Sequence, residues 1–180
     1  MKKRLFLALE LPENIKNELI IQQNNLVRKL GVKGKTHRDA LHLTLKFIGD
    51  FETEKIDSLI KEIEKFTSKV HPFSLTLEKL SCFPDCLKPR IVFVSSTPLQ
   101  PVKAIAESLD SICSRFGVKE EKRPFKPHIT IYRVKKQAKI EEKRVNPLRF
   151  EVNSITLFES VLKPDRAYYN PLKLFRLTGE

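Results

Sequence analysis

Two short segments of the chain carry residue types that can perform acid–base chemistry, and they share one pattern. Residues 42–45 read His-Leu-Thr-Leu and residues 128–131 read His-Ile-Thr-Ile. Side chains alternate between two faces of an extended strand, so the histidine and the threonine of each tetrad point the same way. The two aliphatic residues then point to the opposite face, toward a core. Each tetrad is therefore expected to present one imidazole beside one hydroxyl.

Two such pairs contain the groups needed to open a phosphodiester without a metal. Unperturbed imidazoles titrate near pH 6.5, so one can deprotonate a water while the other protonates the departing ribose oxygen. Thr44 and Thr130 could donate hydrogen bonds to the non-bridging oxygens, where charge builds up in the transition state. A single His–Thr pair in a strand is usually structural. Because the chain has four histidines and two of them carry the pattern, the repeat favours a shared site.

Other residues of the same two segments are candidates for substrate contacts. Lys46 is the next residue on the His–Thr face if the alternation continues, and we expect it to neutralise phosphate charge. Arg133, at the end of the second strand, is expected to form a bidentate phosphate contact. For each of them a solvated basic residue is the alternative. The candidates for stacking on bases, with core packing as the alternative for each, are Phe47, Phe51, Phe125 and Tyr132. His37 and His71 lie outside the tetrads and are given no role.

The elements that must position the tetrads alternate along the chain. Hydrophobic periodicity predicts helices over residues 13–30, 53–66 and from Thr97-Pro98 to Gly117. It predicts strands over residues 3–9, 41–48, 73–80, 91–94, 128–134, 150–158 and 169–177. Each half then runs strand, helix, polar loop and His-Thr strand, which suggests two halves related by a pseudo-twofold axis. No linker rich in glycine or serine separates them. We therefore expect residues 1–180 to form one α+β domain of two coupled lobes with largely antiparallel sheets.

Composition narrows the class of protein. A chain of 180 residues with 41% hydrophobic and 31% charged residues is typical of a globular protein with a substantial core, and no apolar run is long enough to span a bilayer. The apolar run near the N-terminus ends early, at Glu10, which favours a strand over a signal peptide. We therefore expect a cytoplasmic location. The net charge of +12 favours a nucleic-acid or phosphate ligand, with a solvated lysine–glutamate surface as the alternative. Three cysteines are too few for a disulfide framework, so we expect reduced thiols and no metal at Cys82 and Cys86.

With both tetrads placed on strands, the chain resembles the two-histidine (2H) phosphoesterase superfamily. Within it, the chain is most similar to the RNA 2′,3′-cyclic phosphodiesterases of bacteria and archaea, also called 2′-5′ RNA ligases. One departure is Tyr168, where many relatives have an arginine. The segments that carry the resemblance span nearly the whole length and are residues 4–12, 41–49, 83–84, 89–90, 123–134 and 169–172.

The resemblance implies both a fold and an activity. It implies two pseudo-symmetric lobes of antiparallel sheet, helices on the outer faces and an active-site cleft between the lobes. It also implies hydrolysis of a terminal 2′,3′-cyclic phosphate on RNA to a 2′-phosphate, with His42 as proton donor, His128 as proton acceptor, and no metal or other cofactor. RNA ends or cyclic nucleotides would be the partners. The sequence leaves the oligomeric state open, but nothing in it demands a membrane, an obligate protein partner or more than a monomer, so a monomer is the expectation.

Three alternatives remain open from the sequence. The same fold could bind RNA ends or nucleotides without converting them. It could also join RNA ends such as tRNA halves, with a 5′-hydroxyl in place of water, because the same acid–base pair serves both directions. A metal-dependent hydrolase is disfavoured, since no carboxylates lie at fixed spacing near the histidines.

Overall fold

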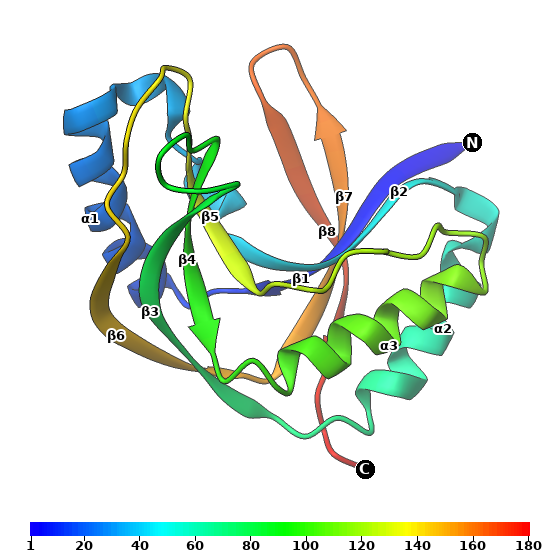
Figure 1. The fold of residues 1–180 in the computed structure, drawn as a ribbon. Helices are drawn as coiled ribbons and strands as arrows, with labels where there is room; N and C mark the ends of the chain where they lie inside the picture. The colour runs from blue at the N-terminus through cyan, green and yellow to red at the C-terminus, as the bar shows by residue number, and fades with distance from the viewer.

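Two four-stranded antiparallel sheets form the body of the molecule (Figure 1). The computed structural model describes residues 1–180. The strands are β1 (Lys2–Glu10), β2 (His42–Glu52), β3 (Phe73–Phe83), β4 (Ile91–Thr97), β5 (His128–Arg133), β6 (Lys143–Val152), β7 (Ser154–Leu162) and β8 (Ala167–Arg176). The helices are α1 (Glu13–Leu30), α2 (Ile56–Thr67) and α3 (Val102–Ser114), and 3₁₀ turns cover Val32–Gly34, Arg38–Ala40 and Thr53–Lys55. The first sheet has the order β2-β1-β7-β8 and the second the order β5-β4-β3-β6.

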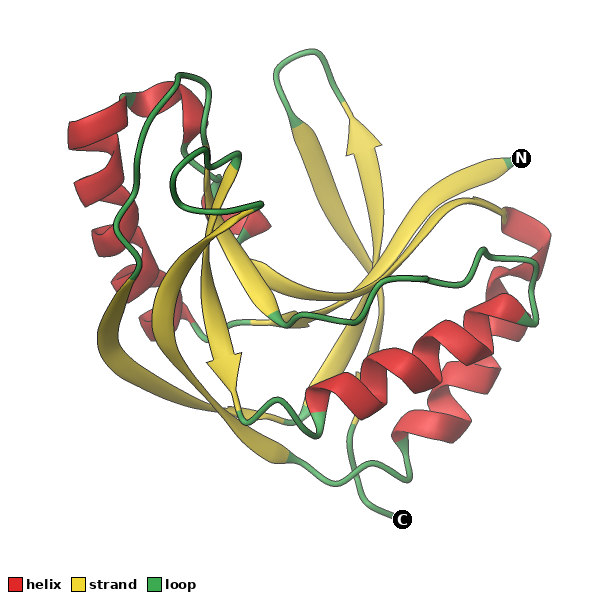
Figure 2. Cartoon of the chain, in the orientation of Figure 1, coloured by secondary structure: helices red, strands yellow, loops and turns green.

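The two sheets are built on the same plan. β1, α1 and β2 in the first lobe correspond to β4, α3 and β5 in the second, and in each case the third element is an edge strand paired with the first. The helices cross between the lobes, because α1 contacts β5 and α3 contacts β2. Figure 2 shows α1 on one flank of the sheets and α2 beside α3 on the other. The predicted repeat of strand, helix, loop and His-Thr strand is therefore present.

Strand alternation explains why one face of the first sheet packs into the main core while the opposite face carries a separate apolar cluster. In β1, Leu5 and Leu7 belong to an apolar core that contains side chains of both sheets. Phe6 and Ala8 alternate with them and form a separate small cluster with Phe158 of β7 on the opposite face. The structure has no helix with the length and apolar character needed to cross a bilayer.

Two predicted elements differ from the structure for topological reasons. The strand predicted over residues 150–158 is two strands, β6 and β7, which lie in different sheets and are separated by Asn153. The third helix begins at Val102, not at the Thr97-Pro98 pair. Thr97 instead ends β4, and its hydroxyl donates to Glu78 Oε1 at 3.3 Å.

The expectation of reduced thiols was wrong for two of the three cysteines. Cys82 and Cys86 form a disulfide, with their Cα atoms 5.1 Å apart. Cys82 lies near the end of β3 and the chain turns back within the following loop, which brings the two residues into bonding range. Cys113 is free and buried, and burial raises the pKa of its thiol to about 12.

Candidate active site

The two tetrads occupy equivalent places in the two lobes. His42 is the first residue of β2 and His128 the first residue of β5. These two edge strands contact one another where the lobes meet near the middle of the molecule (Figure 1). In both tetrads the histidine and the threonine are half-buried, whereas the two aliphatic residues are buried. This burial follows the alternation predicted from the sequence.

An aromatic surface supports the His42 ring on the face of the first sheet that is opposite the main core. The imidazole stacks on Phe6 of β1, with ring centroids 5.0 Å apart. Phe158 of β7 lies 6.1 Å away in a parallel orientation, and Tyr169 of β8 meets the imidazole edge-on at 5.4 Å. Phe6 and Phe158 are themselves stacked at 5.2 Å. Three neighbouring strands therefore fix the position of this ring.

Burial lowers the pKa of the His42 imidazole from its ordinary 6.5 to about 4. A hydrogen bond with the backbone of Asp39 acts in the opposite direction, and so does the Asp39 carboxylate, while the ammonium of Lys16 lowers the pKa further. In the ligand-free protein His42 is consequently neutral near pH 7.

His128 rests on a corresponding aromatic pair in the second lobe. Phe93 of β4 lies 5.6 Å from the imidazole and Phe83 of β3 lies 5.1 Å from it, and these two phenyl rings stack at 4.2 Å. Its Nδ1 atom is 2.6 Å from the carbonyl oxygen of Lys126. Because a carbonyl oxygen can only accept, Nδ1 carries the proton and Nε2 of the neutral ring has a free lone pair. Burial lowers the pKa of His128, and the nearby charge of Arg133 lowers it further.

The aromatic residues that support the two histidines were missed in the sequence, although they repeat. Phe6 and Phe93 lie on the strands beside the tetrad strands, and Phe158 and Phe83 lie on the next strands of each sheet. Their relation depends on the order of strands within the sheets, which a single sequence does not display. The one available signal was that Phe6, Phe83 and Tyr169 fall within the segments that carry the family resemblance.

A β-bulge directs Lys46 away from the tetrad. Thr44 pairs with Ala8 and Lys46 pairs with Leu7, so Leu45 is an extra residue in β2. The side chain of Lys46 is only 6% exposed. Its ammonium forms an ion pair with Asp110 of α3 and donates to the carbonyl oxygen of Lys119 at 2.8 Å. The structure therefore does not bring Lys46 to the histidine and threonine of its own strand.

Phe47 takes the place in which alternation had put Lys46. It is 70% exposed, and its ring centroid lies 6.0 Å from that of Phe6, which also supports His42. Of the other aromatic candidates, Phe51 is buried against Phe116 and Phe125 is half-buried against the core.

The second tetrad strand contains an equivalent bulge. Phe93 pairs with Thr130 and Val92 pairs with Tyr132, so Ile131 is the extra residue in β5. Tyr132 is buried in the core, and its hydroxyl donates to the carbonyl oxygen of Gly31 at 2.6 Å. Arg133 is exposed and lies close enough to His128 to lower the pKa of that residue. Arg133 thus occupies the place in the second lobe that Phe47 occupies in the first.

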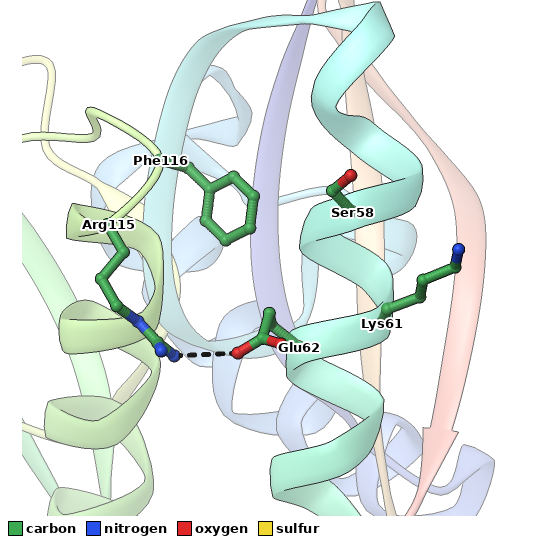
Figure 3. A pocket seen from close by; sticks show the side chains of 5 residues that line it. All are labelled: Ser58, Lys61, Glu62, Arg115 and Phe116. Carbon is green, nitrogen blue, oxygen red and sulfur yellow. Dashed lines mark ion pairs between the residues drawn. The ribbon is translucent and has the colours of Figure 1, made fainter.

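A surface cavity lies apart from the tetrads, between α2 and the end of α3 (Figure 3). An ion pair between Glu62 and Arg115, 3.2 Å long, spans it. Its lining residues are Ser58, Lys61, Glu62, Arg115 and Phe116. Three or more histidine, cysteine, aspartate or glutamate side chains do not gather anywhere in an arrangement that could hold a metal ion.

The chain is similar over almost its full length to proteins of known family. Residues 12–163 match the model of the 2′-5′ RNA ligase superfamily. The chain is 33% identical to the RNA 2′,3′-cyclic phosphodiesterase of Methanocaldococcus jannaschii, over 94% of this chain and 98% of the relative. It is 29% identical to the Escherichia coli protein of the same name, over 98% and 97% of the two chains.

Solved structures give the same result. The fold matches a Thermus thermophilus protein with a TM-score of 0.87 and 28% identity, over 98% of this chain and 99% of that one. It matches Escherichia coli LigT complexed with 3′-AMP with a TM-score of 0.85 and 29% identity, over 99% of each chain. The predicted α+β fold and the prediction that the protein is an enzyme are confirmed. The chain belongs to the 2′-5′ RNA ligase superfamily, the 2H phosphoesterases that its two tetrads indicated.

Proposed function

We propose that the protein hydrolyses terminal 2′,3′-cyclic phosphates of RNA to 2′-phosphomonoesters, using His42 and His128 and no metal ion. The observation that carries this proposal is the pair of His–Thr tetrads at the starts of equivalent edge strands, each histidine held on an aromatic surface. The names of the relatives support the choice of reaction, since they are RNA 2′,3′-cyclic phosphodiesterases.

In the proposed reaction His128 acts as the base. Its Nε2 takes a proton from a water molecule, whose oxygen then bonds to phosphorus, while the bond from phosphorus to the ribose O3′ breaks. The contact between Nδ1 and the Lys126 carbonyl favours this role, because it fixes the tautomer with a free Nε2 lone pair. The lowered pKa of His128 keeps the ring neutral and available as a base at neutral pH.

His42 is the proposed acid, which returns a proton to the departing O3′. A histidine with a pKa of about 4 is a poor proton carrier in the free protein. The negative charge of a bound phosphodiester next to the ring stabilises the imidazolium and raises its pKa. We therefore propose that substrate binding and protonation of His42 are coupled, so that the acid is charged only when the anion is present.

The phosphate and the nucleoside would be held by residues of both lobes. Thr44 and Thr130 are the proposed donors to the non-bridging oxygens, and Arg133 is the proposed counter-charge. The exposed ring of Phe47, on the His42 side, is a suitable stacking surface for the terminal base. Lys46 is left out of this set because its ammonium is occupied by Asp110 and Lys119.

RNA ends and 2′,3′-cyclic nucleotides are the proposed substrates, and the net charge of +12 suits such polyanions. Because the proposed site takes residues from both lobes of one chain, we propose that residues 1–180 act as one domain and as a monomer. A cytoplasmic location is the corresponding proposal for an enzyme that acts on cellular RNA.

Turnover of 2′,3′-cyclic CMP and of an RNA oligonucleotide with a cyclic phosphate end tests the proposal. We expect a 2′-phosphate product, undiminished in excess chelator, and activity reduced to near background in His42→Ala and His128→Ala. His37→Ala and His71→Ala are the matched controls and should retain wild-type turnover. Wild-type turnover in either tetrad variant would contradict the acid–base scheme, and binding of RNA ends without conversion would favour a binding module.

Ligation is a second candidate, because the matching family model is described as the 2′-5′ RNA ligase superfamily. The same two histidines would keep their roles, with His128 deprotonating a 5′-hydroxyl in place of water while the bond from phosphorus to O3′ breaks and His42 protonates O3′. Incubation of two RNA fragments at high end concentration, followed by separation of the products, distinguishes hydrolysis from ligation. A 2′-5′-linked product that exceeds the hydrolysis product would favour the ligase.

A further inference from the structure

The residue four positions after each tetrad histidine, Lys46 in β2 and Tyr132 in β5, points into the protein and contacts the other lobe. We propose that these are positioning residues that act across the lobes: each holds the segment that leads into the opposite tetrad. Lys46 would thereby set the position of His128, and Tyr132 that of His42. This inference rests on the proposed function, since it assigns the two residues to the alignment of the same acid–base pair.

Lys46 holds the segment that leads into β5. Its ammonium donates to the carbonyl oxygen of Lys119 at 2.8 Å and pairs with Asp110 of α3. The Asp110 carboxylate in turn accepts from the backbone N–H of Glu121, at 3.1 and 3.2 Å to its two oxygens. Two backbone groups of this segment, nine and seven residues before His128, are thus fixed to β2 through Lys46 and Asp110.

Tyr132 holds the segment that leads into β2. Its hydroxyl donates to the carbonyl oxygen of Gly31 at 2.6 Å, and its backbone forms an isolated antiparallel bridge with Lys35. Gly34 packs directly on the ring, since a Cβ at that position would lie 2.4 Å from the nearest ring carbon. These contacts fix residues 31–35 against β5, seven to eleven residues before His42.

The bulge in β5 adds further bonds to the same junction. The carbonyl oxygen of Ile131, the bulged residue, accepts from the backbone N–H of Thr36 at 3.2 Å. It also accepts from the side-chain amide of Gln23, at 2.8 Å, and the same amide nitrogen donates to the carbonyl oxygen of Thr36 at 2.7 Å. Gln23 is fully buried in α1, so its bond to Ile131 forms away from water.

A reciprocal arrangement suits a mechanism that needs an acid and a base on opposite sides of one phosphorus atom. A displacement of about 1 Å in such a pair can reduce turnover about 100-fold. A buried ion pair such as Lys46–Asp110 is weak evidence for stability, because desolvation of the two charges offsets their attraction. The bulges present these side chains to the opposite lobe, whereas regular alternation would have directed Lys46 to the phosphate.

The test compares Lys46→Met with Tyr132→Phe and follows the titration of each imidazole by NMR. Single histidine substitutions assign the four ring signals. We expect Lys46→Met to shift the titration of His128 while that of His42 is retained, and Tyr132→Phe to shift the titration of His42 while that of His128 is retained. For turnover of 2′,3′-cyclic CMP we expect kcat to fall about 10- to 100-fold in each variant, with a smaller change in KM.

Two further variants keep the test decisive. Lys3→Met removes a lysine–glutamate pair elsewhere in the first sheet, that with Glu159 at 3.0 Å, and should leave both histidines and kcat unchanged. Lys46→Met combined with Asp110→Asn avoids an uncompensated buried carboxylate if the single variant does not fold, and should show the same shift at His128.

The crossed pattern alone supports the inference. A shift confined to the histidine of the substituted strand, equal shifts at both histidines, or no shift at either would overturn it. The NMR readout needs no substrate, so an absence of turnover in the wild-type protein would refute the proposed function separately from the positioning roles.

Discussion

The low pKa of His42 predicts that anion binding becomes stronger as the pH falls. With a pKa of about 4, about one in a thousand His42 rings is protonated at pH 7. One negative charge about 4 Å from the imidazolium, at an effective dielectric constant of about 20, stabilises it by about 4 kcal/mol. That energy corresponds to about three pH units, enough to bring His42 close to half protonation at neutral pH.

The expected effect on affinity follows from proton linkage. The bound state holds a proton on His42 that the free state lacks between pH 4 and neutrality, so each unit decrease in pH strengthens binding up to about tenfold. With a pKa of about 4 in the free protein and about 7 in the complex, the gain from His42 alone between pH 7 and pH 5 is about 50-fold.

Sulfate is the suitable probe, because its own charge stays constant over this pH range. Calorimetric titrations in buffers of different ionisation enthalpy give the number of protons taken up, and NMR gives the His42 titration directly. His42→Gln should lose its part of the pH dependence, whereas His37→Gln should keep the full dependence. A His42 ring that titrates near 6.5 in the free protein, or a slope unchanged in His42→Gln, would refute the reasoning.

The same pKa has a consequence for stability. The unfolded chain takes up a proton on His42 near pH 6.5, but the folded protein does so only near pH 4. The free energy of unfolding should therefore decrease as the pH falls through this window, by up to about 3 kcal/mol for this residue. Between pH 7 and pH 5 this loss amounts to about 2 kcal/mol, and it should be absent in His42→Phe, as measured by urea unfolding at the two pH values.

Three further predictions concern the hydrogen-bond donors to the phosphate, the stacking of the nucleobase and a close contact between the lobes. Thr44→Val and Thr130→Val should each reduce kcat about 100-fold, with Thr→Ser at each position as the active control, measured with 2′,3′-cyclic CMP. Phe47→Ala should raise KM for that substrate about tenfold while sulfate affinity stays unchanged, because the substitution removes only the stacking surface of the nucleobase. Gly34→Ala should lower the thermal unfolding temperature and reduce stability by about 2 kcal/mol or more, since its Cβ would lie 2.2 Å from a backbone oxygen of β5.

Local patterns predicted much of the secondary structure, because they depend on neighbouring residues. The helix predicted over residues 13–30 is α1 with the same bounds, and the half-buried and buried residues of both tetrads alternate as expected. Strand order and strand ends depend on distant partners. The crossing from β6 to β7 at Asn153 therefore remained hidden within one predicted strand.

The placement of Lys46 shows why local alternation fails at a site. A bulge is defined by the partner strand, here the step from Ala8 to Leu7 opposite Thr44 and Lys46, and the tetrad strand alone does not reveal it. The internal repeat contained a usable signal. Lys46 aligns with Tyr132, a large aromatic residue that favours the interior, and Phe47 aligns with Arg133. Comparison of the two halves would therefore have predicted that the side chain of Lys46 points into the protein.

The differences between the two halves give a physical reason for the proposed division between acid and base. Backbone positions are equivalent, yet Phe47 accompanies His42 whereas Arg133 accompanies His128. In an in-line displacement the attacking water and the departing oxygen lie on opposite sides of phosphorus. The departing O3′ belongs to the nucleoside, so the catalytic acid must lie on the side of phosphorus where the nucleobase is held. If Phe47 stacks on the terminal nucleobase, His42 is the histidine near O3′. His128, beside the guanidinium of Arg133, then faces the attacking water.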